Sequence, residues 1–156
     1  AMIGTIEYVS ATLYLYANVY MIELVHNLGN DEVAVNGLKL LIKDFITSMP
    51  TGKQNTFANK TVPQYVLVTI RPDTPVNLVS AFEEPVKSRK GYVQPSINKL
   101  ETEYQDTQKF VEKPLAAFVL TNEASTLDSQ MKNIDDLVAN VAAAVETGIS
   151  DENSTN

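Results

Sequence analysis

The sequence predicts an α+β domain in which an antiparallel sheet carries helices packed on one face. Residues 5–21 alternate between apolar and polar side chains with period two, the pattern of a long half-buried strand. Residues 31–49 repeat apolar side chains at spacings of three and four, the pattern of an amphipathic helix. A polar loop over residues 51–60 then leads to an apolar run, residues 64–70. Helix, loop and strand in this order occur in the second half of a ferredoxin-like domain.

The first predicted strand has two different sides. Its odd-numbered side is apolar, and its even-numbered side alternates tyrosines with small polar residues. Exposed aromatic rings on a sheet are the surface on which single-stranded bases stack in RNA binders of the RRM class. Tyr14, Tyr16 and Asn18 are therefore candidate sheet-face contacts. The alternative is that the rings cover a second layer of the same protein.

Two helices follow the first strand. A short amphipathic stretch, residues 21–28, ends at Gly29. Asn30 then supplies a helix cap, and acidic residues follow it in the first turn of the helix 31–49. Pro50 cannot continue that helix.

The remaining elements alternate between apolar strands and helices. Residues 64–70 predict a strand, and residues 76–82 predict either a short edge strand or a helical turn. A helix is expected from Pro95 until Pro114 stops it. Residues 115–120 predict a buried strand. Apolar residues stepping by four and three then predict a last helix over 127–145.

The length of 156 residues, with 44% hydrophobic and 20% charged residues, fits a single globular domain over residues 1–148. Residues 149–156 are predicted to be a disordered acidic tail. The apolar run at 115–120 is far shorter than the roughly 20 residues of a membrane span. No Lys or Arg precedes Lys39, so a secretory signal is not expected. We therefore expect a cytoplasmic location.

Charge is distributed unevenly along the chain, although the net charge is −7. Residues 36–100 hold nine Lys and Arg against four acidic residues, which gives +5, whereas residues 101–156 hold three against eleven, which gives −8. Cations are needed to contact phosphates. Residues 51–100 are therefore predicted to face a nucleic acid. The alternative is that the two halves only form differently solvated faces.

Two groups in this central region combine cations with amide and hydroxyl groups, which suits contacts to sugar and phosphate. The first lies in the polar loop and the second in a basic turn. Together they comprise Lys53, Gln54, Asn55, Thr56 and Lys60, then Lys87, Arg89 and Lys90.

No catalytic pattern stands beside these residues, so no enzyme activity is expected. Gly52 and Lys53 do not form a phosphate-binding P-loop, because Thr47 takes the place of its first glycine and Gln54 follows the lysine. Glu83 and Glu84 are neighbours and would point to opposite faces of a strand. The chain has no cysteine and one histidine, so neither a thiolate metal site nor any cofactor is expected.

An ordered set of short blocks from Gly4 to about Tyr104 resembles a known family. The blocks are Gly4-Thr5, Glu7, Tyr14-x-Tyr16-Ala17-Asn18, Asn27-Leu28-Gly29, Pro50-x-Gly-Lys-Gln54, Ala81-Phe82-Glu83 and Gly91-Tyr-Val-Gln-Pro-Ser-Ile97. The set resembles the CasC (Cas-seven type) backbone subunit of the type I-E CRISPR Cascade complex, whose members are about twice as long and match here in their C-terminal half.

The resemblance implies part of a hand-like subunit with an RRM-like palm, whose copies polymerise along crRNA. It implies as partners crRNA, other copies of the subunit, other Cascade subunits and, through the complex, target DNA. By motif matching, Lys53 and Gln54 become candidate crRNA or subunit contacts, with Asn55 and Thr56 as neighbours. Backbones of type I-E are not expected to cut nucleic acid.

The expected function is that of a fragment of a non-catalytic crRNA-binding backbone subunit, acting in CRISPR interference and antiviral defence. The alternative is a module that holds neighbouring protein subunits without touching RNA. The acidic end of the chain and its last helix favour this alternative.

Overall fold

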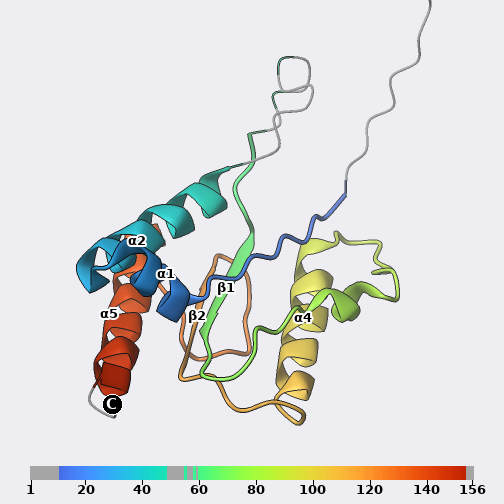
Figure 1. Cartoon of the computed structure of the whole chain (residues 1–156). Coiled ribbons are helices and arrows are strands. Elements are labelled where there is room, and N and C mark those ends of the chain that lie inside the picture. Colours follow the sequence, from blue (N-terminus) through green and yellow to red (C-terminus); the bar gives the residue numbers. More distant parts are fainter. Residues whose placement is uncertain (1–10, 49–54, 56–57, 59, 154–156) are drawn as a thin grey trace, which may run out of the picture.

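The computed structural model describes residues 11–48, 55, 58 and 60–153 (Figure 1). Helices precede, separate and follow the two strands of a single sheet among these residues. In order they are α1 (Met21–Leu28), α2 (Asp31–Thr47), β1 (Tyr65–Ile70), η1 (Val79–Phe82), α4 (Val93–Thr107), β2 (Ala116–Thr121) and α5 (Ile134–Asn153). The predicted α+β class is confirmed.

The two strands pair antiparallel, with Tyr65 opposite Thr121 at one end and Ile70 opposite Ala116 at the other. Because side chains alternate across a strand, the sheet has two different faces. One face packs into the main core through Val66, Val68, Ile70, Phe118 and Leu120. The predicted strands 64–70 and 115–120 therefore exist, each within a residue of its expected bounds.

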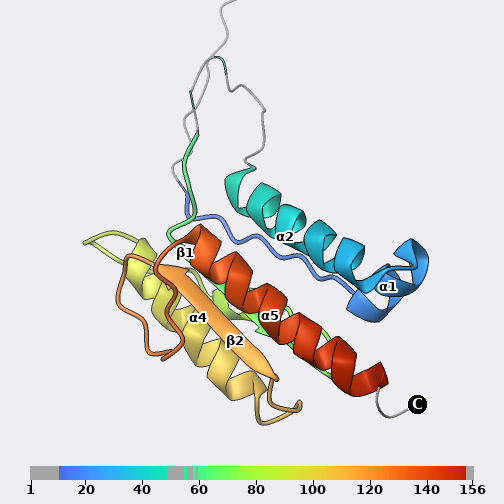
Figure 2. The same ribbon diagram turned by 90° about the vertical axis from the view of Figure 1, so that its left-hand side faces the viewer.

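Helices α2 and α5 cover this apolar face, and Figure 2 shows them on the same side of the strands. Val35 and Leu38 of α2 meet Leu137 and Val141 of α5 in the core. At the rim, the Lys43 ammonium lies 2.7 Å from the Asp135 carboxylate. That pair is exposed, so it adds little stability beside the apolar contacts.

Helix α4 lies on the opposite side of the strands (Figure 1). Tyr65, which alternates with the core-facing Val66, donates its hydroxyl to Glu101 of α4. The expectation of helices on one face therefore holds for α2 and α5 and not for α4. An apolar run such as that of β1 does not reveal which element covers each of its two faces.

Local signals at helix ends agree with the structure. The Asn30 side chain accepts a hydrogen bond of 3.0 Å from the Val33 amide and caps α2 as predicted. Gly29 ends α1 with φ of 66°, the left-handed conformation that glycine adopts without strain. For residues 76–82 the sequence left open an edge strand or a helical turn. The helical turn is the one that forms, because η1 is a short 3-10 helix within this range.

The predicted long first strand is wrong over residues 11–20, which form no strand in the structure. The strand pairing among the described residues joins β1 to β2 and does not include this segment, and a strand needs a neighbour to bond its backbone groups. The apolar side expected to be half-buried is open as well, with Leu13 63% and Leu15 49% exposed. Residues 5–10 and Met49, the first and last parts of two predicted elements, lie outside the described residues.

The later helices differ from prediction at their ends. Helix α4 begins at Val93, two residues before Pro95, and ends at Thr107, before Pro114 is reached. Helix α5 begins at Ile134 and runs past Gly148 to Asn153, so most of the predicted disordered tail is helical. In the described part of the chain, no helix combines the length and the apolar character needed to cross a membrane.

Candidate nucleic-acid interface

The basic turn, residues 87–90, links η1 to α4 at the edge of the molecule. Lys87, Arg89 and Lys90 are all exposed. The Lys90 amide donates a hydrogen bond of 3.2 Å to the Ser88 hydroxyl, and Gly91 follows with φ of 102°. These contacts shape the backbone and leave the three cationic groups without an ion pair among the described residues.

The polar loop before β1 is described only in part. Asn55 and Lys60 are exposed. Lys53, Gln54 and Thr56 lie outside the described residues. Figure 1 places the segment 60–64 beyond one end of β1 and the basic turn beside the start of α4. The structure therefore presents the described candidates at two separate places.

Tyr14 has a structural partner within the chain. Its hydroxyl donates to the Asn77 side-chain oxygen and accepts from the Leu78 amide, both at 3.0 Å. Its ring centre lies 5.6 Å from that of Phe82 on η1. Burial raises the pKa of the Tyr14 hydroxyl above its usual value. Tyr14 thus ties the segment 11–20 to η1.

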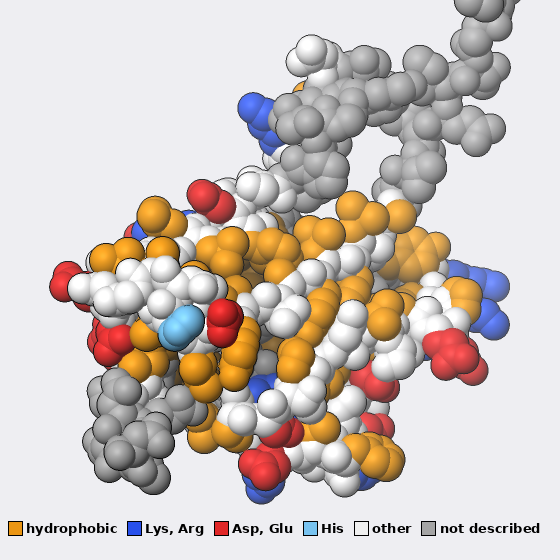
Figure 3. Space-filling model, viewed as in Figure 1, with side chains coloured by type: hydrophobic (Ala, Val, Ile, Leu, Met, Phe, Trp, Pro, Cys, Tyr) orange, Lys and Arg blue, Asp and Glu red, His pale blue; other side chains and the backbone are white. Residues whose placement is uncertain are grey.

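Tyr16 and Asn18, the other two candidates on this segment, are exposed. Figure 3 shows apolar side chains in broad bands on the face that carries α1 and residues 11–20. Tyr16 and Asn18 thus belong to a segment that also exposes Leu15 and Val19, whereas the candidate cations lie elsewhere.

Arg71, counted among the cations by the sequence, is not free to bind phosphate. Its side chain is largely buried, and it forms two hydrogen bonds of 3.0 Å with the Asp73 carboxylate. It also donates to the carbonyl oxygens of Thr74 and Glu112. The guanidinium holds the pKa of Asp73 at about 2. This cluster braces the end of β1 against the loop that follows α4.

Glu101 is a buried charged group that no sequence pattern predicted. The side chain is 2% exposed. It accepts hydrogen bonds from the Tyr65, Ser125 and Thr126 hydroxyls and from the Thr126 amide. Burial alone would raise the pKa of this carboxyl, but these four donors outweigh burial and lower it. The carboxylate therefore holds α4, β1 and the loop after β2 together.

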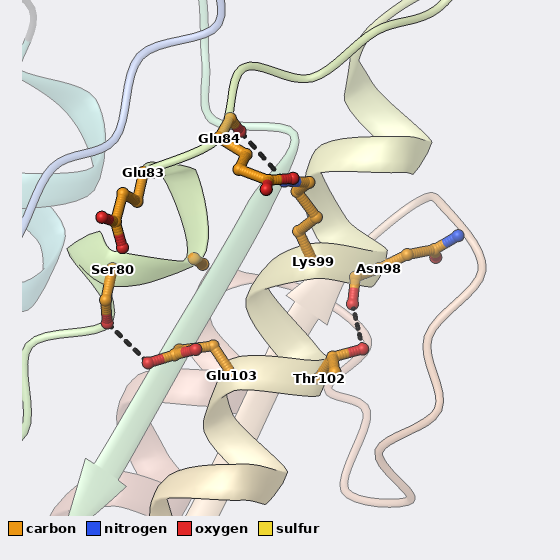
Figure 4. A pocket seen from close by; sticks show the side chains of 8 residues that line it. Ser80, Glu83, Glu84, Asn98, Lys99, Thr102 and Glu103 are labelled. Atoms are coloured by element: carbon orange, nitrogen blue, oxygen red, sulfur yellow. Dashed lines mark hydrogen bonds between the residues drawn. The ribbon is translucent and has the colours of Figure 1, made fainter.

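A shallow groove of about 470 Å³ separates η1 from α4 (Figure 4). Its polar groups bind one another. The Ser80 hydroxyl donates to Glu103 at 2.5 Å, and the Lys99 ammonium donates to the Glu84 carbonyl oxygen at 2.9 Å. In Figure 4, Glu83 points away from Glu84, so the two carboxylates do not converge. None of the predicted site residues lines this groove.

Comparison with known proteins gives the family. The model of a Cas family described as CT1975-like protein matches residues 1–146. The chain belongs to this family. One solved structure, described as a CRISPR RNA-guided surveillance complex, is similar to 79% of this CT1975-like protein, with a TM-score of 0.71 and 25% sequence identity. These matches confirm the predicted resemblance to a Cas-seven type backbone subunit.

A second structure, described as a CRISPR RNA-guided surveillance complex, pre-nicking, is similar to 80% of the CT1975-like protein, with a TM-score of 0.69 and 23% identity. At that identity the similarity concerns the fold alone. The chain spans 50% of the first matched chain and 35% of the second. No curated protein matches it.

Proposed function

We propose that this chain is part of a non-catalytic, crRNA-binding backbone subunit of a type I-E CRISPR interference complex, acting in antiviral defence in the cytoplasm. It corresponds to the C-terminal half of such a subunit. Its partners are crRNA, further copies of the subunit and other Cascade subunits, with target DNA bound through the complex. The observation that carries the proposal is the family match over residues 1–146, together with the fold shared with an RNA-guided surveillance complex.

The exposed cations support a contact with the RNA backbone. Lys60, Lys87, Arg89 and Lys90 are exposed and form no ion pair among the described residues. Exposed cations of this kind suit phosphates, since phosphate contacts bind RNA without reading its sequence. Lys53, Gln54, Asn55 and Thr56 complete the proposed contact set. Tyr16 and Asn18 are proposed as further contacts, whereas Tyr14 is occupied by η1.

Single-stranded RNA binding at several salt concentrations tests the proposal. The double variant Lys87→Glu/Lys90→Glu should bind about tenfold more weakly. The slope of the logarithm of its binding constant against the logarithm of the salt concentration should be smaller by about one to two. The matched control, Lys39→Glu/Lys132→Glu, makes the same change of net charge on α2 and before α5. Equal losses in both double variants would indicate a general charge effect and remove the basic turn from the site.

The second candidate is a protein interaction module without RNA contact. The observation that favours it is the concentration of exposed apolar side chains between residues 13 and 45, among them Leu13, Leu15 and Leu40. Crosslinking of the assembled complex separates the two candidates. RNA adducts within residues 51–60 or 87–90 support RNA binding, and adducts to protein alone support the module.

A further inference from the structure

Tyr92 is an exposed tyrosine two residues beyond the basic turn. It lies directly before α4, and its side chain is 50% exposed. Among the described residues, its hydroxyl forms no hydrogen bond and its ring does not pack on another ring. Tyr14, by contrast, binds η1 with both its hydroxyl and its ring. The Tyr92 ring is therefore available to a ligand.

The first turn of α4 fixes the backbone of Tyr92. The Tyr92 carbonyl oxygen accepts a hydrogen bond of 3.0 Å from the Ser96 amide and one of 2.6 Å from the Ser96 hydroxyl. Ser96 is itself buried, with 6% of its surface exposed. The ring is thus presented from a fixed position on the fold. Binding to such a ring loses less conformational entropy than binding to a ring on a loose loop.

Unpaired cations lie close to this ring in the chain. Residues 87–92 hold three Lys and Arg and no acidic residue. Only Gly91 separates Lys90 from Tyr92, and two residues of chain span at most about 7 Å. Figure 3 shows Lys and Arg side chains gathered at the edge of the molecule where Figure 1 places the start of α4. A ligand on the ring therefore lies within reach of the Lys90 ammonium.

Exposure alone does not distinguish Tyr92 from other aromatic residues. Phe110 is more exposed, at 88%, but the ammonium of the adjacent Lys109 is paired with Asp106 at 2.7 Å. Tyr20 is 66% exposed and belongs to the part of the chain that has no Lys or Arg. Tyr92 differs from both because the cations beside it form no ion pair among the described residues.

An aromatic ring beside unpaired cations is the combination that holds single-stranded nucleic acid, since bases stack on the ring while cations follow the phosphates. A base inside a duplex is stacked on both faces, so only an unpaired base can use the ring. We infer that Tyr92 stacks on an unpaired base of single-stranded RNA whose phosphates lie on the basic turn. The inference rests on the proposed function, because it adds a base contact to the phosphate contacts of the same turn.

A protein partner fits this place less well than RNA. Aromatic residues at the centre of protein interfaces lie where charged residues are depleted. Around Tyr92 the chain is instead rich in cations, which a protein surface would have to desolvate or pair. Every base offers a π face, so stacking of this kind also tolerates any sequence.

Binding of oligouridine RNA to the purified chain, measured by fluorescence anisotropy at several salt concentrations, tests the inference. Tyr92→Ala should weaken binding about fivefold to a hundredfold, the range of one stacked base. Its dependence on salt should equal that of the wild type, because no charge is removed. Tyr92→Phe keeps the ring and should bind as the wild type does. Phe110→Ala removes an exposed ring elsewhere and should leave binding unchanged.

Removing the bases from the oligomer isolates the stack. An abasic oligomer of the same length keeps every phosphate and offers the ring no base. The wild type and Tyr92→Ala should bind it equally, since the ring contributes only where a base is present. Single-stranded DNA of the same length is the third ligand. A loss in Tyr92→Ala that is confined to DNA would overturn the assignment to RNA.

Urea unfolding checks that Tyr92→Ala is folded, and Tyr92→Leu, which keeps apolar bulk without a π face, should bind as weakly. Equal binding of oligouridine by the wild type and both variants overturns the inference. If Lys87→Glu/Lys90→Glu weakens binding while Tyr92→Ala does not, the phosphate contacts stand and only the stack is excluded. A wild-type chain that does not bind single-stranded RNA would count against the proposed function and the inference together.

Discussion

The hydroxyl of Tyr65 on β1 donates a hydrogen bond of 2.9 Å to the buried carboxylate of Glu101 on α4. The remaining donors to this carboxylate come from Ser125 and Thr126, in the loop after β2. Burial, and then the adjacent carboxylate, raise the pKa of Tyr65 above its usual range, so the hydroxyl stays protonated as a donor. One charged group thus connects a helix, a strand and a loop on the face of the sheet that α5 does not cover.

Glu101→Gln should lower the free energy of unfolding by about 1–3 kcal/mol, because an amide accepts fewer of these hydrogen bonds and adds donors where donors already point. Urea unfolding at neutral pH measures the change. The control Glu123→Gln makes the same substitution at an exposed site and should stay within about 0.5 kcal/mol of the wild type. Equal stability of the two variants would mean that the buried carboxylate does not hold α4 in place.

Stability should fall in acid. The pKa of Asp73 is about 2 in the folded chain against an ordinary 3.8, and that of Glu101 lies below its ordinary 4.5. Both folded values are lowered, so each contribution is complete above the ordinary value and is lost as pH falls through the folded one. Urea unfolding should show a decrease beginning near pH 4.5 and continuing toward pH 2.

The variant Asp73→Asn isolates one part of this decrease. It should be less stable than the wild type at neutral pH, because it loses its charged contact with Arg71. Its decrease between pH 3.8 and about 2 should be shallower, since one titrating group is gone. Asp128→Asn, at an exposed carboxyl, should retain the wild-type slope. An unchanged slope in Asp73→Asn would contradict the assignment.

The elements that sequence predicts best are those decided by neighbouring residues. The Asn30 cap and the Gly29 stop depend on bonds made within a few residues. Both strands were predicted from short apolar runs, although β1 and β2 pair with each other from distant parts of the chain. The segment 11–20 fails because a strand is defined by a partner, and the partner is not a local property. For the same reason, Arg71 and Glu101 could be read as solvated charges. Glu101 binds Tyr65, which lies 36 residues away. Arg71 has a local partner in Asp73, but its contact with Glu112 spans 41 residues.

The family was predicted better than the site. Short ordered blocks led to a resemblance that the family match confirms. The blocks did not indicate that Tyr14 is bound to η1. The charge distribution placed two groups of cations in one region of sequence, whereas the described members lie at two places on the molecule. Proximity in sequence was a weak guide here because η1 and β1 separate the two groups.

Replacing Gly29 and Gly37 by alanine, one at a time, should change the stability of the chain in opposite directions. Gly29 has φ of 66°, which a Cβ atom disfavours, so Gly29→Ala should destabilise the chain by about 1 kcal/mol. Gly37 lies inside α2 with open space around it, so Gly37→Ala should stabilise the chain by about 0.5–1 kcal/mol. Urea unfolding of dilute, monomeric protein checks both. Changes of the same sign would contradict the conformational argument.

Tyr14→Phe should release the segment 11–20 from η1. The substitution keeps the ring near Phe82 but removes the hydroxyl that accepts from the Leu78 amide and donates to Asn77. Leu78 is buried, so its amide would lose its partner at a cost of about 1–3 kcal/mol. Hydrogen exchange should show faster exchange of the Leu78 amide. Tyr16→Phe removes the hydroxyl of an exposed neighbour and should leave that amide unchanged, so equal rates in the two variants would contradict the proposed anchor.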